Sequence, residues 1–478
     1  MRRGRVVKAG LDYAGRYAGA AAVVLVLLAA LCAPQRAALT GEPLDPRAQR
    51  LIGARHYSGH GGVKDYVKAF EWLLRAARQG DAAARFHVGY MYDNAQGVPR
   101  SPADAVRWYR LAAEQGRVEA QFNLALLLSA PGGPLEDAAE AVRWFHRAAR
   151  GGSVPAQVNL GFMYFTGAGV ERNRAEAAGW FRRAAQRENA VAQFNLGVVH
   201  RGGHGTPQDD AEAVGWFRRS ARQGFVPALL ALGAAYDRGA GVAVDRAEAA
   251  FWYRLAAARG AARAQYRLAA MYGRGEGVAR DAAEAVSWLR KAAVQGYARA
   301  QVRLGLRYDR GIGVAENDAE AAKWYRLAAE QGNPHAQFNL GSMYDNGDGV
   351  AENDAEAVRL YRAAAVQGHR GAQNGLGIMY ATGAGGLPKD DRGAVRWYRA
   401  AAEQGDVQAQ FNLAAMYDAG RGVPEDDVRA YAWYNLAADR GNREAARFRT
   451  AIGSRLLAAN IVRAQRLSNL LSRRVPAR

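Results

Sequence analysis

Residues 297–332 read YARAQVRLGLRYDRGIGVAENDAEAAKWYRLAAEQG, and residues 333–368 repeat the pattern as NPHAQFNLGSMYDNGDGVAENDAEAVRLYRAAAVQG. In each stretch, two segments with apolar residues at helical spacing flank a loop with two glycines, which predicts a helix–loop–helix unit. The first helix, helix A, is expected from about Ala298 to Asp309, and the second, helix B, from about Asp318 to Gln331. Gly332 is expected to end helix B in the left-handed conformation.

The tryptophans show that this unit recurs along most of the chain. Eight of the ten are spaced 36 residues apart, and the last two keep that spacing after one inserted glycine near Gly385 and Gly386. A fixed period of this length is the signature of a solenoid, whose units share one continuous core. We therefore predict an all-α chain of about eleven 36-residue repeats. The tryptophans are Trp72, Trp108, Trp144, Trp180, Trp216, Trp252, Trp288, Trp324, Trp397 and Trp433.

The recurring residues of the unit have mechanical roles. Gly305 removes a side chain from helix A so that helix B can approach, and Tyr308 and Trp324 are expected to be large anchors between helices. The pair Ala328–Ala329 is expected to form a thin seam for the next repeat. Asp318 stands at the start of helix B, where its carboxylate can cap free N–H groups.

The chain ends differ from the repeats. Residues 1–35 combine a basic start with an uncharged stretch over 17–35, which indicates either a membrane anchor or a cleaved signal peptide. Residues 36–44 are expected to be a linker and residues 45–441 the solenoid. Residues 442–478 are basic and amphipathic, and they predict a capping helix or helix pair, since the terminal units of a solenoid need a polar outer face. The basic flank predicts that the solenoid lies outside the inner membrane, in the periplasm.

The charge of the chain is uneven. The net charge is +20, and residues 442–478 contribute nine arginines against Glu444, whereas residues 34–441 are only mildly basic. The arginines of the repeats are scattered rather than gathered in a stripe with aromatic residues, so nucleic-acid binding is not expected. The basic C-terminal segment can still contact anionic lipid or an acidic partner. A single cysteine, Cys32, excludes an intrachain disulfide.

Three motifs carry a resemblance to a known family. They are AQFNLGSMY at 336–344, the Gly-x-Gly-Val loop at 347–350, and AAKWYRLAAEQG at 321–332. Together they resemble the Sel1-like repeat, a relative of the tetratricopeptide repeat, and the resemblance covers residues 45–441. It implies a right-handed α-superhelix that acts as an adaptor, often in bacterial envelope signalling or host contact.

The same resemblance points to a binding groove. By alignment with the tetratricopeptide pattern, the residue before the recurrent leucine of helix A should face the concave side. Asparagines there can pair with a peptide backbone of any sequence, and arginines would favour an acidic stretch. The alternative is that these asparagines satisfy hydrogen bonds within or between repeats. The predicted groove residues are Asn123, Asn159, Asn195, Arg267, Arg303, Asn339 and Asn412.

No motif in the chain predicts catalysis. The Gly-x-Gly loops follow helices rather than strands, so they are expected to be turns and not phosphate loops. His200 and His204 lack a third metal ligand, and no serine or cysteine stands in a nucleophile motif. We therefore expect no catalytic residue, cofactor or metal.

The predicted function is a non-catalytic scaffold that binds a partner protein or peptide in bacterial envelope regulation or signalling. One alternative is a cell-wall-active protein that binds or hydrolyses peptidoglycan or β-lactams. The penicillin-binding branch of the family is cysteine-rich, and this chain lacks those cysteines. The other alternative is a secreted protein that binds a host protein. If the signal is cleaved, the expected location is the periplasm or the exterior rather than the inner membrane.

Overall fold

The computed structural model describes residues 45–60 and 62–475, and throughout that part of the chain the regular structure is α-helical, without strands. Contacts divide the chain into an N-terminal unit that ends at Asp245 and a C-terminal unit that begins at Arg246. The predicted anchor or signal over residues 1–35 and the linker over 36–44 lie outside the described residues. Within those residues, no helix combines the length and the apolar character that crossing a membrane would require.

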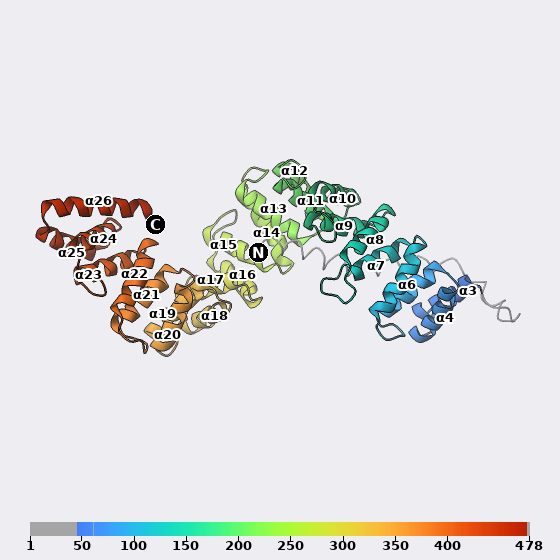
Figure 1. The fold of residues 1–478 in the computed structure, drawn as a ribbon, viewed down its shortest axis with the longest axis horizontal. Helices are drawn as coiled ribbons and strands as arrows, with labels where there is room; N and C mark the ends of the chain where they lie inside the picture. The colour runs from blue at the N-terminus through green and yellow to red at the C-terminus, as the bar shows by residue number, and fades with distance from the viewer. Residues whose placement is uncertain (1–44, 61, 476–478) are drawn as a thin grey trace. The chain divides into compact units, whose positions relative to one another are not determined.

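The helices follow one another along each unit (Figure 1). The N-terminal unit contains α3 (Pro46–Ser58), α4 (Tyr66–Arg78), α5 (Ala82–Asp93), α6 (Pro102–Glu114), α7 (Val118–Leu128), α8 (Ala138–Arg150), α9 (Val154–Thr166), α10 (Arg174–Gln186), α11 (Ala190–Gly202), α12 (Asp210–Arg222) and α13 (Val226–Arg238). The C-terminal unit contains α14 (Arg246–Ala258), α15 (Ala262–Arg274), α16 (Ala282–Val294), α17 (Ala298–Asp309), α18 (Asp318–Glu330), α19 (Pro334–Asn346), α20 (Asp354–Ala365), α21 (Arg370–Thr382), α22 (Asp391–Glu403), α23 (Val407–Asp418), α24 (Asp427–Asp439), α25 (Arg443–Arg455) and α26 (Ala458–Arg474).

Each repeat is the predicted helix pair. α17 and α18 lie side by side as helix A and helix B of one repeat, and α18 also contacts α19, which is helix A of the next. α17 has the predicted bounds, and α18 ends one residue before the predicted Gln331. Gly332 has the expected left-handed conformation, with φ of +79°, and its N–H donates to the carbonyl of Ala329 at 2.8 Å.

The cap of helix B is one residue earlier than predicted. Asn317 is the capping residue of α18, and its side-chain oxygen accepts from the backbone N–H of Glu320 at 2.9 Å. Asp318 is instead the first residue of the helix, where its charge suits the positive end of the helix dipole. The residue before helix B does the same in other repeats, as Asp137 and Asp281 illustrate.

The core of each repeat forms around the residue after the tryptophan. Tyr325 is 1% exposed, and a β-carbon built at Gly305 would lie 2.7 Å from its Cε1 atom. Gly305 therefore admits the ring of Tyr325, which confirms the close approach of helix B. Ala328 and Ala329 are buried in the cluster that also holds residues of α19, as the predicted seam requires.

Trp324 and Tyr308 connect neighbouring repeats. Trp324 and Tyr308 are half-buried, and both pack against the cluster that α16 of the preceding repeat forms with α17, which includes Leu289 and Leu304. The hydroxyl of Tyr308 also accepts a hydrogen bond from Arg290 of that preceding repeat. Both residues are thus anchors, as predicted, but they act mainly between repeats.

The loop glycines lie in turns that pack against the preceding repeat. At Gly313, φ is +77°, and a β-carbon would lie 2.2 Å from the carbonyl oxygen of Ala282 at the start of α16. Only glycine fits this conformation together with this contact. The loop of the third repeat, residues 129–137, lacks the motif and closes differently, with the N–H of Gly132 donating to Glu136 at 2.7 Å.

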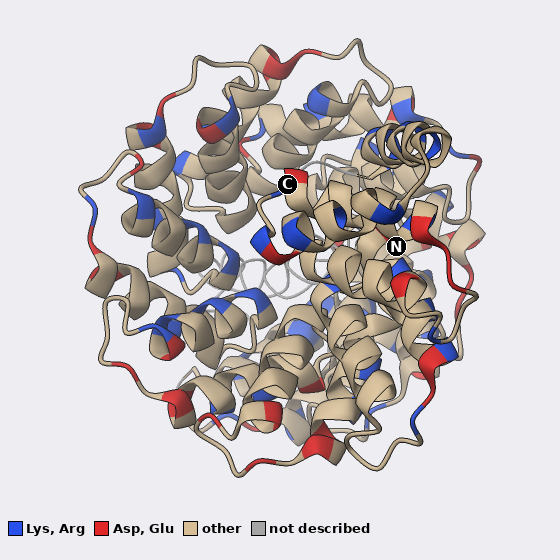
Figure 2. Ribbon diagram, turned by 90° about the vertical axis from the view of Figure 1, so that its left-hand side faces the viewer, with Lys and Arg blue, Asp and Glu red and all other residues tan. Residues whose placement is uncertain are grey.

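Charged residues divide between loops and helices. In Figure 2, Lys and Arg lie along many helices, whereas many Asp and Glu residues lie in the loops and at the starts of helices. This distribution follows from capping, because acidic side chains stabilise the N-terminal ends of helices.

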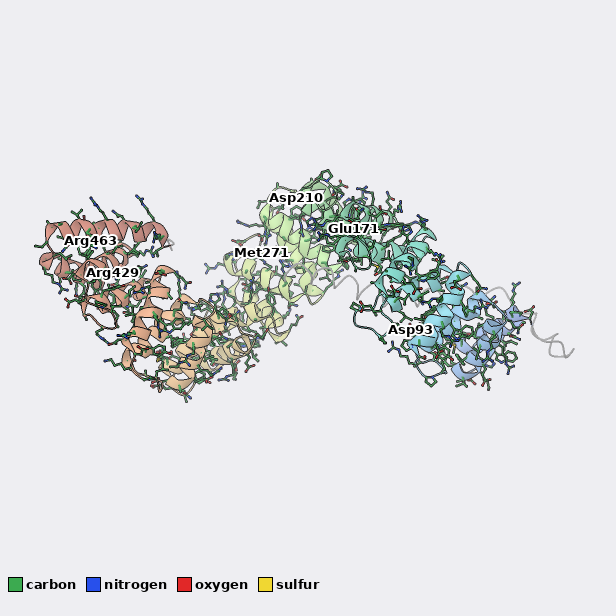
Figure 3. The ribbon with its side chains drawn as sticks, viewed as in Figure 1. Asp93, Glu171, Asp210, Met271, Arg429 and Arg463 are labelled. Atoms are coloured by element: carbon green, nitrogen blue, oxygen red, sulfur yellow. The ribbon has the colours of Figure 1, made fainter. Side chains whose placement is uncertain are left out.

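The C-terminal segment forms a pair of helices, α25 and α26, that both pack on α24. α26 buries Ala464 and Ser468 and leaves Arg463 exposed (Figure 3). The last turn of α25 is held by Arg455, whose guanidinium pairs with Asp418 and Asp427. The pair covers the end of the last repeat, as expected of a cap.

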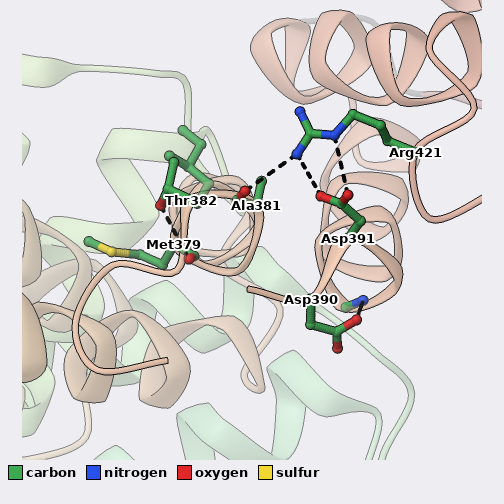
Figure 4. A network of polar contacts seen from close by, with 8 residues as sticks. Met379, Ala381, Thr382, Asp390, Asp391 and Arg421 are labelled. Carbon is green, nitrogen blue, oxygen red and sulfur yellow. Dashed lines mark hydrogen bonds and ion pairs between the residues drawn. The ribbon is translucent and has the colours of Figure 1, made fainter. Parts of the chain in front are cut away.

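A second ion pair joins the last two repeats. The guanidinium of Arg421, in the loop before α24, contacts both carboxylate oxygens of Asp391 at 2.6 and 3.2 Å and donates to the carbonyl of Ala381 at 3.4 Å (Figure 4). The hydrogen bond to Arg421 lowers the pKa of the Asp391 carboxyl. Arg421 thus ties the loop to the ends of α21 and α22.

Candidate functional site

The predicted groove residues of the N-terminal unit are largely engaged inside the protein. Asn159 is 3% exposed, and its Nδ2 donates to the carbonyl of Pro155 in its own helix at 3.0 Å. Asn123 is half-buried and donates to the hydroxyl of Tyr109 at 3.3 Å. Asn195 is 9% exposed, and its Nδ2 finds no partner among the described residues.

The predicted groove residues of the C-terminal unit are more accessible. Arg303 is exposed, and Arg267, Asn339 and Asn412 are half-buried. Asn412 donates to Asn374 at 3.0 Å, and the side chain of Asn339 hydrogen-bonds that of Tyr325. The role of these positions in peptide binding stays a prediction.

The carboxamides that do run from repeat to repeat are glutamines. Gln301 is 3% exposed, and its Nε2 donates to the carbonyl of Ala293 at the end of the preceding helix B, at 3.1 Å. Its Oε1 accepts from Gln331 at 2.8 Å. Sequence reasoning missed this structural ladder, although its signal was present in the glutamines that recur in helix A and just after helix B. The corresponding buried glutamines are Gln121, Gln157, Gln193, Gln265, Gln337, Gln373 and Gln410.

A hollow of about 400 Å³ opens in the C-terminal unit beside α15 and α17. Its apolar lining, which we call its floor, includes Leu289, Leu306 and Ile312. Five arginines surround this floor, and we call the site the arginine hollow: Arg274, Arg280, Arg303, Arg307 and Arg310. Arg303, one of the predicted groove residues, lines the arginine hollow. Arg267, another of them, lies on α15, the helix that contributes Arg274 to the hollow.

The electrostatics of the arginine hollow are one-sided. Among the described residues that line it, no carboxylate is present. Burial, together with the charges of Arg303 and Arg280, lowers the pKa of the half-buried Arg307 guanidinium. Of the five arginines, Arg274 has a close ion pair, with Glu276 at 2.7 Å. The site is therefore suited to an anion with an apolar part.

The histidines and carboxylates do not form a metal site in the described part of the chain. Within residues 45–60 and 62–475, no three His, Cys, Asp or Glu side chains come together in a way that could hold a metal ion. Two imidazoles do meet, with Nε2 of His369 at 3.1 Å from Nδ1 of His335, and Phe338 stacks on His369. The N–H of Ala372 donates to Nδ1 of His369, so this pair closes the start of α21.

Comparisons with known proteins agree with the architecture. The Sel1 repeat family matches eleven segments of the chain between residues 46 and 442. The segments fall within one or two residues of the repeats predicted from the sequence, as 298–333 does against 297–332.

Two bacterial crystal structures are similar to this protein. A protective antigen present in uropathogenic Escherichia coli strains, which displays an SLR fold, is 36% identical with a TM-score of 0.75, over 91% of this chain and 93% of that one. A Sel1 repeat protein from Oxalobacter formigenes is 35% identical with a TM-score of 0.55, over 65% of this chain and 89% of that one.

Two curated plant proteins match a short stretch. The ERAD-associated E3 ubiquitin-protein ligase components HRD3A and HRD3B of Arabidopsis thaliana are 42% and 40% identical over 52 residues. The match spans 11% of this chain and only 8% and 9% of the lengths of those relatives. Sel1 repeat solenoids are typically non-catalytic folds for protein interaction. With eleven matched segments across its length, this chain belongs to the Sel1 repeat family.

Proposed function

We propose that this protein is a non-catalytic scaffold that binds a partner protein or an extended peptide along its A helices. The supporting observation is that the positions of the repeat fall into two classes. Several core positions keep their residue type in most repeats, as the buried glutamines and the paired alanines of helix B do. In the C-terminal unit, where the position before the recurrent leucine is accessible, it changes instead, from Arg267 and Arg303 to Asn339. A constant core with a variable face is what a binding solenoid requires.

The proposal also assigns a place in the cell. A basic start followed by the uncharged residues 17–35 supports an inner-membrane anchor, with the repeats in the periplasm of a bacterium and a role in envelope regulation. Cell fractionation followed by N-terminal sequencing of the mature protein tests this placement. Recovery in the cytoplasm would contradict it, and a mature N-terminus beyond residue 35 would replace the anchor with a cleaved signal.

Site-specific photocrosslinking tests the binding face. A photoreactive residue is introduced at Arg303 or at Asn339 on the A helices, in the full-length protein, and crosslinked in cells. Matched probes at Glu330 and Glu403 occupy exposed positions at the ends of helix B.

The proposal expects one discrete adduct from the A-helix probes and none from the helix B probes. Equal adducts from both sets would move the contact elsewhere, and no adduct from any probe would contradict the scaffold. Hydrolysis of a chromogenic β-lactam by the purified protein would contradict the non-catalytic assignment.

A further inference from the structure

Arg307 differs in residue type from the same position of the other repeats, and packing of the core does not explain the difference. The corresponding position is apolar in every other repeat from the second to the eleventh. It is a buried methionine in six of them, at Met91, Met163, Met271, Met343, Met379 and Met416. Met271 immediately precedes this repeat in the series and lies on α15 (Figure 3). A charged group has therefore replaced a core methionine at one point of the solenoid.

A second departure makes room for that arginine. Position 273 is Gly, whereas five other repeats carry an aspartate there, including Asp237 and Asp309. A β-carbon at Gly273 would lie 2.8 Å from Nη2 of Arg307, so the guanidinium lies where a side chain at 273 would begin. The same substitution removes the carboxylate that would otherwise neutralise the arginine. The two departures together place Arg307 in the arginine hollow without a carboxylate partner among the residues that line it.

The charge in the arginine hollow carries an energetic cost. A partly desolvated cation beside like charges is destabilised, and the lowered pKa of Arg307 reflects this. The nearby carboxylates are engaged at the rim: Glu276 pairs with Arg274, and Asp309 lies near Arg310 and Tyr325. A site that accepts such a cost is suited to an anionic ligand, whose binding would relieve it.

We propose that the arginine hollow binds a peptide segment in which acidic side chains stand next to a large apolar one. The carboxylates would pair with Arg303 and Arg307, since a guanidinium presents a fork that matches a carboxylate. The apolar side chain would cover the floor at Leu289, Leu306 and Ile312, which is 37% exposed. A free phosphate would satisfy the arginines but leave this floor open to water. This inference rests on the proposed scaffold function and names the chemistry of its partner.

Fluorescent synthetic peptides test the proposal with the full-length protein. The probe is a ten-residue peptide with a Glu-Glu-Leu centre, and its matched partners carry Gln-Gln-Leu or Glu-Glu-Ser. The acidic apolar peptide is expected to bind at least about tenfold more tightly than either partner, because charged hydrogen bonds and apolar burial each contribute more than about 1.4 kcal/mol. Its affinity should fall as the salt concentration rises.

Two variants restore the residues of the other repeats and are therefore expected to fold. Arg307→Met recovers the core methionine, and Gly273→Asp places a carboxylate beside Arg307 in the position of the ligand. Each should weaken the acidic peptide at least about tenfold. Arg299→Met removes one charge from an exposed position of the same helix outside the hollow, and it should leave the affinity within about twofold.

The outcomes separate the inference from the scaffold function. Equal affinity for the Glu-Glu-Leu and Gln-Gln-Leu peptides would overturn the acidic specificity. Displacement of the peptide by millimolar inorganic phosphate, with no loss on changing Leu to Ser, would show a small-anion site instead. If the photocrosslinked partner is retained by Arg307→Met and Gly273→Asp, the scaffold function stands and the arginine hollow is not its binding site.

Discussion

The second glycine of each loop is required where two repeats meet, and Gly313→Ala tests this requirement. The substitution adds a β-carbon that would lie 2.2 Å from the carbonyl oxygen of Ala282, with φ of +77°. The left-handed conformation costs an L-residue about 1–2 kcal/mol, and relieving an overpacked contact costs about 1–3 kcal/mol more. We therefore expect Gly313→Ala to destabilise the protein by about 2–5 kcal/mol.

Two matched variants isolate the contributions. Gly332 has nearly the same φ, +79°, but a β-carbon there would meet nothing within 4 Å. Gly332→Ala should thus show the conformational cost alone, about 1–2 kcal/mol. Gly179 lies within α10, and its β-carbon would also meet nothing within 4 Å. Gly179→Ala should stabilise by about 0.5–1 kcal/mol, because alanine favours the helix.

Urea unfolding followed by circular dichroism gives the order of the three variants. Because repeat arrays can unfold in steps, amide hydrogen exchange should accompany it. Gly313→Ala is expected to speed exchange in α16 and α17, on both sides of the loop contact, more than in distant repeats. If Gly313→Ala costs no more than Gly332→Ala, or if exchange rises equally everywhere, the reasoning about loop docking is refuted.

Three further predictions concern polar contacts. Gln301→Ala leaves the Ala293 carbonyl and Gln331 without their buried partner, and it should lower the free energy of unfolding in urea by about 1–3 kcal/mol. The control Gln331→Ala changes an exposed residue and should cost much less, so equal costs would contradict a structural ladder. Arg455→Ala should raise the rate of amide hydrogen exchange in α25 and α26 and leave the rate in α21 unchanged. An unaltered exchange rate in α25 and α26 would contradict the anchoring role of Arg455. Burial lowers the pKa of His369 from 6.5 to about 4, so the folded state binds fewer protons than the unfolded chain between these values, and stability should fall as the pH drops from about 7 toward 4. His369→Asn keeps a capping side chain and should reduce the fall in melting temperature between about pH 7 and pH 5, whereas an unchanged slope would disprove the contribution.

The repeat, its length and the helix bounds of the 297–332 unit, to within one residue, could be predicted from the sequence. These follow from local rules, since apolar spacing, capping residues and helix-ending glycines act within one turn of the chain. The bounds of α17 and the left-handed Gly332 were predicted for that reason. The loop glycines were identified as turns by the same argument.

Which side chains are buried, and which contact one another, depends on how the helices stack. Period alone does not distinguish Trp324, which joins repeats, from its neighbour Tyr325, which fills the core. The burial of Asn159 and the glutamine ladder both depend on packing between neighbouring helices. The arginine hollow brings residues from Tyr266 to Ile312 together, and its character comes from two departures 34 residues apart, Gly273 and Arg307. A repeating pattern conceals such departures, because their effect appears only when stacking places one repeat against the next.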